Sequence, residues 1–540
     1  MKKIALLFHT VKYLKWQQIY HRLLRLVKSH PKVSQTQTER MTLSKEWLHN
    51  PLFDEKITPE LEATFLNQSK KLVLPFDWDN ESPSKLWVYN LHYFETLLSF
   101  DCREKHAFHL ELLERWIREN PIGKGNAWEP YPISLRISNI LKAWLGGLPL
   151  SKNIQQSLYQ QADYLSQDLE KHLLGNHYFV NLKALLFAGV VFEQTKWRDI
   201  AQEALYKEIP EQILPDGANF ELAPMYHDLI LVDMLDMHNL ALAYPSSVTQ
   251  KLKSLLKSKI PLMISYMQTM RHPDGGVAFF NDSTNKIAPE MATILDYAKR
   301  LGFETNEKRL DNSVFNGEAS GYFVAQYGVS KLIVDGAKVG PDYIPGHGHA
   351  DTLSLELSIG RERVLVNRGT SVYGLSKERL SQRKTLAHNT VEVDGRDSSQ
   401  VWSGFRVAKR AKIIERTIDG ASGNQVTFQA THNGYKNIFG GCYHQRRVEF
   451  SQNRLVVNDQ LIGNYKKAVG RFHFHPALNV ELSKGNLIVS GKTFVMQATV
   501  GKEARLIDVN WHPGFSQSIG TKALEFPVLN HFNQIVFTWS

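Results

Sequence analysis

The spacing of apolar residues changes once along this chain of 540 residues, and that change limits the folds available to it. From about residue 85 to 310, apolar residues recur at helical spacing in segments that end at glycine, proline or asparagine, as in HAFHLELLERWIREN. After about residue 315 they alternate instead, as in LSLELSIG, and turn signals such as Asp-Gly separate the runs. The sequence therefore predicts a helical half followed by a strand-rich half.

We expect more than one large folding unit, because a single hydrophobic core rarely supports a chain of this length. The run of paired helices has no repeat of fixed length and predicts stacked hairpins or an α/α toroid over residues 41–314. The alternating half predicts an antiparallel β-sandwich over residues 315–540. Residues 1–40 are set apart as a basic amphipathic segment.

The net charge of +10 is concentrated at the N-terminus, where eight lysines and arginines precede the first acidic residue, Glu39. The rest of the chain is nearly neutral and shows no nucleic-acid-binding motif, so we expect no nucleic acid partner. A basic amphipathic helix is suited either to an anionic membrane surface, here through residues 10–28, or to packing on its own protein. Its apolar and aromatic residues recur at helical spacing: Tyr13, Trp16, Tyr20, Leu23 and Val27.

The N-terminal apolar run Ile4–Phe8 is short for the core of a signal peptide, and no small-residue cleavage site follows it. No later stretch reaches the roughly 18 uncharged apolar residues of a membrane span. We therefore expect a cytoplasmic protein or one peripheral to the inner membrane, with the periplasm as the alternative. Cys102 and Cys442 are too few for a disulfide framework and are expected to be buried thiols.

Two segments of the helical half carry polar groups that suit a cleft. In KHLLGNHYFVN, Asn176 is either the N-cap of the next helix or, with His177, a hydrogen-bond donor to an anion. In PDGANFELAPMYHDL, Tyr226 begins a helix. It is either an anchor between helices or a phenolic acid and base whose pKa positive neighbours lower from about 10.

The segment AWEPYPISLRISN brings together Trp128, Tyr131 and Arg136. The two rings could stack on a sugar and the guanidinium could clamp a carboxylate, or the arginine could form a structural pair inside the toroid. Arg383, in SQRKTLAHNTVEVDG, is likewise assigned to substrate binding.

In the strand-rich half, GHGHADTLSL places His347 and His349 on one face of an extended segment, which suits two imidazoles serving one site. His388 precedes a later strand, and Asn367 ends another. A tetrahedral metal site needs three or four ligands. A structural metal ion that stabilises the sheet would therefore require His349, His388 and a group at position 367 to lie close together.

At these residues the chain resembles the heparinase II/III-like polysaccharide lyases. Six matching segments lie in the family's order between about residues 85 and 410: KLWVYNLHYFETL, WEPYPISLRI, GNHYFVNLKALLFAG, PDGANFELAPMYHDLILVDML, GHGHADTLSLELSIGRERVLVNRGTS and AHNTVEVDGRDSSQVW. The resemblance implies an incomplete α/α toroid followed by antiparallel β-sheets. It also implies β-elimination at a uronic acid, which breaks the bond between C4 and the glycosidic oxygen without water and without a cofactor.

The resemblance also implies roles for single residues. Asn176 and His177 would neutralise the uronate carboxylate. Tyr226 would be the base, the acid, or both in turn, with His347 as the complementary base or the group that keeps Tyr226 reactive. Arg136 would clamp the substrate.

His349 and His388 match positions that hold a structural metal, commonly zinc, in some members of the family. Two departures stand out. Asn367 replaces the aspartate that is commonly the third metal ligand, and an amide is a poor zinc ligand. Val180 occupies a position where many relatives have glutamate.

Our leading hypothesis is a lyase that cleaves an acidic, uronate-containing glycan in bacterial surface-polysaccharide metabolism. The second is a glycan-binding or polysaccharide-assembly factor with weak catalysis, which Val180 and Asn367 motivate. The third is a metal-dependent glycan hydrolase built on the His-Gly-His pair; it ranks lowest because few carboxylates accompany these histidines.

Overall fold

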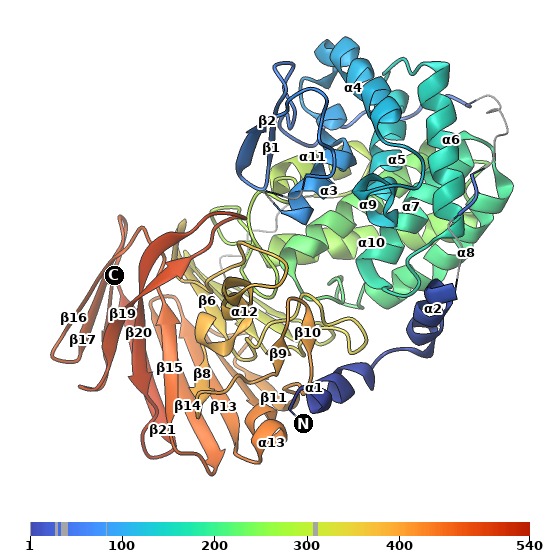
Figure 1. The fold of residues 1–540 in the computed structure, drawn as a ribbon. Helices are drawn as coiled ribbons and strands as arrows, with labels where there is room; N and C mark the ends of the chain where they lie inside the picture. The colour runs from blue at the N-terminus through green and yellow to red at the C-terminus, as the bar shows by residue number, and fades with distance from the viewer. Residues whose placement is uncertain (1, 28–30, 34–40, 81, 83, 306–311) are drawn as a thin grey trace.

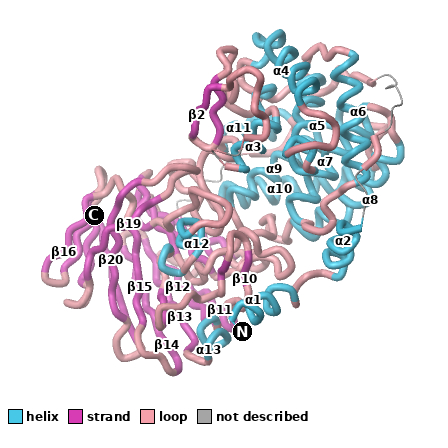
Figure 2. The backbone as a smooth tube through the Cα atoms, in the orientation of Figure 1, coloured by secondary structure: helices cyan, strands magenta, loops and turns pink. Residues whose placement is uncertain are grey.

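The computed structural model describes residues 2–27, 31–33, 41–80, 82, 84–305 and 312–540. Its helical half and its strand-rich half lie side by side, and Figure 2 shows how cleanly the two kinds of structure separate. Lys28 and the expected end of the N-terminal segment at residue 40 lie outside the described residues.

The helical half forms the curved layer of paired helices in Figure 1. Helices α7 and α9 are buried along almost their whole length and lie at the centre of its core, as expected of helices that are apolar around most of their circumference. A short hairpin, β1 (Glu62–Phe65) and β2 (Gln68–Lys71), precedes this layer. The helices are α3 (Lys85–Tyr93), α4 (His106–Glu119), α5 (Pro130–Leu145), α6 (Lys152–Gln167), α7 (Gly175–Val191), α8 (Thr195–Gln212), α9 (Pro224–Ala243), α10 (Gln250–Thr269) and α11 (Met291–Arg300).

The strand-rich half begins with a five-stranded antiparallel sheet in the order β3-β4-β5-β6-β7. Alternate residues of β4 face two different cores. Tyr322 and Val324 pack against the toroid with Tyr266, whereas Phe323 and Ala325 pack against the larger sheet of the sandwich. The five strands are β3 (Asn312–Asn316), β4 (Tyr322–Tyr327), β5 (Ser330–Asp335), β6 (Leu355–Ile359) and β7 (Glu362–Leu365).

An eight-stranded sheet and a four-stranded sheet complete the sandwich, in the orders β11-β12-β13-β14-β21-β18-β17-β16 and β19-β20-β15-β8. A small hairpin pairs β9 with β10, and two short helices, α12 (Lys377–Arg383) and α13 (Gly434–Phe439), interrupt the strands. The strands are β8 (Val391–Val393), β9 (Val401–Trp402), β10 (Arg406–Val407), β11 (Ile413–Asp419), β12 (Gln425–His432), β13 (Cys442–Ser451), β14 (Arg454–Gly463), β15 (Ala468–His473), β16 (Asn479–Ser483), β17 (Asn486–Ser490), β18 (Val495–Thr499), β19 (Arg505–Trp511), β20 (Ile519–Pro527) and β21 (Phe532–Trp539).

The predicted fold class, a toroid followed by an antiparallel β-sandwich, is confirmed. The last toroid helix ends at Arg300 and the first strand of the sandwich half begins at Asn312. Both cysteines are buried free thiols, as expected. Among the described residues, the structure contains no helix with the length and apolar character that crossing a bilayer requires.

The N-terminal segment forms two helices, α1 (Lys2–Val11) and α2 (Trp16–Val27), where one amphipathic helix was expected to include Tyr13. Tyr13 lies in the turn between them, under the guanidinium of Arg410 at 4.1 Å from the ring centre. In Figure 1 the two helices run along the side of the molecule from the strand-rich half to the toroid.

Candidate active site

A cleft of about 910 Å³ lies between the toroid and the strand-rich half. Toroid helices supply polar groups to it, among them Tyr131 from α5, Asn176 and His177 from α7, and Tyr226 from α9. His347 reaches it from the loop before β6. The four residues predicted to be catalytic therefore line one cleft, together with Tyr131.

The start of α7 holds Asn176 against the wall of the cleft. The expected N-cap role of Asn176 is wrong, because the helix begins at Gly175 and the Asn176 side chain turns away from the free amides to donate to the Tyr131 hydroxyl at 3.2 Å. The backbone amide of Asn176 donates to Glu221 Oε1 at 3.3 Å. The Asn176 amide oxygen is buried and has no hydrogen-bond partner among the described residues.

Gly175 is needed at the same turn for two reasons. Its φ of +54° lies in the left-handed region, and a Cβ there would come within 2.8 Å of Ile344 and 3.2 Å of Glu221. The sequence Gly-Asn-His thus lets the helix start close against the loop that carries His347.

His177 is the most exposed of the predicted catalytic side chains and lies against the Tyr131 ring, with 4.6 Å between ring centres. Its Nδ1 is 3.0 Å from Glu170 Oε1. Burial lowers the pKa of His177, but the charge and hydrogen bond of Glu170 outweigh burial, so the net pKa is raised from 6.5. Asn181 holds Glu170 in place through two hydrogen bonds. The Glu170 carboxylate therefore favours the protonated form of His177 at the cleft.

The rings of Tyr226 and His347 lie against each other, with 4.0 Å between their centres and 33° between their planes. The Tyr226 hydroxyl is 3.1 Å from the hydroxyl of Tyr373. Burial, and then the neighbouring Tyr373, raise the pKa of Tyr226 well above 10. Tyr226 is therefore a neutral phenol that can donate a proton, and the expected lowering of its pKa by positive neighbours is wrong.

Asp282 fixes the tautomer of His347. Its Oδ2 lies 2.9 Å from His347 Nδ1, and Arg379 Nη2 donates to the same oxygen at 2.6 Å. Burial raises the pKa of Asp282, but Arg379 and the two histidines hold it well below 3.8. Because an ionised carboxylate only accepts, His347 donates from Nδ1 to Asp282, and its Nε2 lies 3.6 Å from Glu221 Oε2.

Sequence reasoning missed the supporting residues of this site. Glu221 and Asp282 are buried carboxylates, and Tyr373 pairs with Tyr226 across the cleft. Asp282 is 65 residues away from His347 and belongs to no matched segment, whereas Glu221 lies in the matched PDGANFE segment without having been singled out.

Three of the four predicted substrate-binding residues need correction, because they are buried behind the cleft wall. Trp128 packs between Trp116 and Tyr164. Arg136 is fully buried over Trp116 and donates to Gln161 Oε1 and to two backbone carbonyls. Arg383 is fully buried as well.

Arg383 donates to the carbonyls of Gly348 and Gly404, so it fastens the loop that carries His347. The arginines at 136 and 383 thus brace the protein's own backbone. Among the four predicted substrate-binding residues, Tyr131 is the one that lines the cleft. Val180, where many relatives were expected to have glutamate, also lines it.

Behind His347, His349 and His388 face each other with 3.3 Å between Nδ1 and Nε2. One possible ligand atom from each of His349, Asp351 and His388 lies within 4.8 Å of the other two. Zinc ligands about 2.0–2.1 Å from the metal in a tetrahedral site are spaced by about 3.4 Å, so the two nitrogens fit such a site. Asn367 uses its amide oxygen to accept from the Asn389 amide at 3.2 Å. The structure therefore offers Asp351 as the third ligand in place of Asn367.

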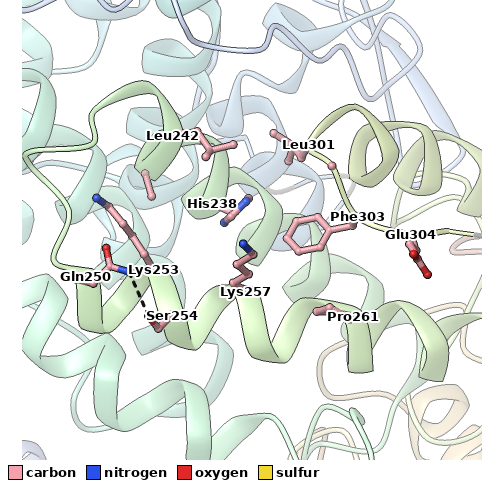
Figure 3. A pocket seen from close by; sticks show the side chains of 12 residues that line it. His238, Leu242, Gln250, Lys253, Ser254, Lys257, Pro261, Leu301, Phe303 and Glu304 are labelled. Carbon is pink, nitrogen blue, oxygen red and sulfur yellow. Dashed lines mark hydrogen bonds between the residues drawn. The ribbon is translucent and has the colours of Figure 1, made fainter.

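A second pocket, of about 640 Å³, lies on the toroid between α9, α10 and the segment after α11 (Figure 3). His238, Lys257 and Phe303 point into it. Burial and Lys257 lower the pKa of His238 to about 4, so its imidazole is neutral. The pocket contains none of the predicted site residues.

The protein thus combines an α/α toroid, an antiparallel β-sandwich and a cleft between them that is lined by an amide, two imidazoles and two phenols. The heparinase II/III N-terminus model matches residues 99–307, and the heparinase II/III-like C-terminal model matches residues 309–533. The chain belongs to the heparinase II/III-like family.

Two curated relatives are heparin-sulfate lyases. The one from Pedobacter heparinus is 27% identical over 403 residues, 67% of this chain and 56% of the relative. The one from Bacteroides stercoris is 23% identical over 451 residues, 72% of this chain and 62% of the relative. The chain thus spans less than two thirds of either relative's length. The crystal structure of heparinase III shares the fold, with a TM-score of 0.70 at 14% identity over 96% of this chain and 88% of that chain.

Proposed function

We propose that this protein is a polysaccharide lyase that cleaves an acidic, uronate-containing glycan by β-elimination. The observation that carries the proposal is the meeting of Asn176, His177, Tyr226 and His347 in one cleft. Family membership and the two relatives named as heparin-sulfate lyases support it.

The first requirement of elimination is to make the C5 proton acidic, and the uronate carboxylate must be neutralised to do so. His177 supplies the positive charge in its protonated form, which Glu170 favours by raising the pKa of the imidazole. The Asn176 side chain supplies a polar contact. In the structure the Asn176 NH₂ group donates to the Tyr131 hydroxyl; turning the amide over would let that hydroxyl donate to the amide oxygen and free the NH₂ group to donate to the substrate carboxylate.

The second requirement is a base and an acid on the reacting sugar. His347 Nε2 removes the C5 proton, because Asp282 holds the proton of the ring on Nδ1. The electrons of the C5–H bond form the C4–C5 double bond as the C4–O bond breaks. Tyr226, which burial keeps protonated, gives its phenolic proton to the departing oxygen. The proton that His347 has gained restores Tyr226 through solvent.

We further propose that His349, Asp351 and His388 hold a structural metal ion, zinc by the chemistry of the donor set. The ion would stiffen this corner of the strand-rich half and take no part in proton transfer. His349 Nε2 lies 2.8 Å from Asp282 Oδ1, so Asp282 joins the metal ligand to His347.

The test is to mix the purified protein with a panel of acidic polysaccharides and follow the ultraviolet absorbance of the unsaturated uronate. We expect a rising signal with at least one uronate-containing glycan and none with neutral glucans. Binding of an acidic oligosaccharide without any product would instead identify a glycan-binding protein and overturn the proposal.

A further inference from the structure

The two N-terminal helices form a strap, residues 2–27, that joins the two halves of the molecule. On the strand-rich side, the indole nitrogen of Trp402 donates to the Thr10 hydroxyl at 3.1 Å. Gln18 Nε2 donates to the carbonyl of Leu173 in the toroid at 3.1 Å and to the carbonyl of Tyr343, in the loop before β6, at 3.2 Å. The strap lies outside the residues that the family models match.

Helix α2 docks on the toroid through its polar face. Gln18 is 1% exposed, Arg22 donates to the His172 carbonyl, and Arg25 lies 3.4 Å from Asp168 Oδ2. Lys15, just before the helix, pairs with Glu211. The polar contacts named here that hold α2 on the toroid are hydrogen bonds and ion pairs.

The apolar face of α2 is left in solvent, which is the reverse of a helix that packs on its own protein. Trp16 is 74% exposed, Leu23 58% and Val27 81%. Together with Tyr20 these residues lie on one side of the helix, because they are spaced by four, three and four positions. In α1, Ile4 and Phe8 are exposed in the same way.

We propose that the strap docks the protein on an anionic lipid bilayer, with this apolar face in the interface. Residues 2–27 contain six lysines and arginines and no aspartate or glutamate, so their charge is complementary to anionic headgroups. Trp16 and Tyr20 are side chains that favour the boundary between headgroups and acyl chains. A second copy of the chain fits this face poorly, because two identical basic segments would repel each other.

The position of the strap gives this docking a geometric consequence. Leu7, Thr10 and Gln18 also line the cleft that contains Tyr226 and His347. A bilayer against the outer face of the strap would therefore lie beside the mouth of the cleft.

The test is co-sedimentation of the full chain with vesicles of phosphatidylcholine, with and without a third of phosphatidylglycerol. The variant is Trp16→Ser/Leu23→Ser, and the matched control is Val329→Ser/Phe532→Ser, which removes a similar exposed apolar area outside the strap. We expect the parent and the control to bind anionic vesicles alike. The strap variant should lose binding by at least about tenfold, with an unchanged circular dichroism spectrum.

Equal binding by the strap variant and the parent would overturn the proposal, as would a parent that binds no anionic vesicles. Sedimentation velocity without lipid provides a further check. A dimer of the parent that the strap variant abolishes would assign the face to a second copy of the chain instead.

Discussion

Replacing Tyr226 with phenylalanine removes only the phenolic oxygen, and we expect this change to affect catalysis much more than stability. The ring stays against His347, and the lost hydrogen bond to Tyr373 is worth about 0.5–1.5 kcal/mol of unfolding free energy. Loss of a general acid costs about 10²- to 10⁴-fold in kcat, or about 3–5 kcal/mol in the barrier. The effect on the barrier should therefore exceed the effect on stability severalfold.

Tyr373→Phe is the matched control, because it breaks the same hydrogen bond from the other side. Both variants should lose about the same unfolding free energy in urea, while kcat falls by less than about tenfold in Tyr373→Phe and by at least about a hundredfold in Tyr226→Phe. The assay is the initial rate of unsaturated-uronate absorbance on the substrate found in the panel. If Tyr226→Phe retains a tenth or more of kcat, or if the control is equally impaired, Tyr226 is not the acid.

Three further outcomes are expected. Glu170→Gln should lower the pKa of His177, because the Glu170 carboxylate raises it. The fall of kcat/KM at alkaline pH should then move to lower pH. An unchanged pH profile would contradict the role of the protonated His177. Arg136→Lys should lower the free energy of unfolding, measured in urea, by about 2 kcal/mol without changing KM, because the hydrogen bonds of Arg136 stabilise the toroid. A tenfold higher KM would instead show that Arg136 binds substrate. Elemental analysis should find one zinc ion per chain in the parent protein and far less in His388→Gln. A parent protein that takes up no metal would show that His349 and His388 only form a hydrogen bond with each other.

The change from helical to alternating spacing was enough to predict both halves of the fold, because each half follows its own period over many elements. The periodicity of the strap predicted an amphipathic helix as well. It could not predict which face is buried, since ion pairs such as Lys15 with Glu211 form only when the toroid is already in place.

The candidate site was only partly predictable. The family-like segments gave the residues at the cleft, but Asp282 and Tyr373 meet His347 and Tyr226 only through the packing of the two halves.

Arg136 shows a signal that sequence reasoning could have used. It lies five residues after Tyr131 on one helix, which turns it by about 140° away from the cleft face. A nearby arginine and tyrosine on α5 could not both face the same sugar.

The central claim is that the bond breaks by elimination, and digestion in water enriched in heavy oxygen tests it most directly. The measurement is the mass spectrum of the products from the polysaccharide that the panel identifies. The account predicts new ends that carry an unsaturated uronate and no heavy oxygen, because the C4–O bond breaks without water. A heavy oxygen at the new ends would show hydrolysis and contradict the roles given to His347 and Tyr226.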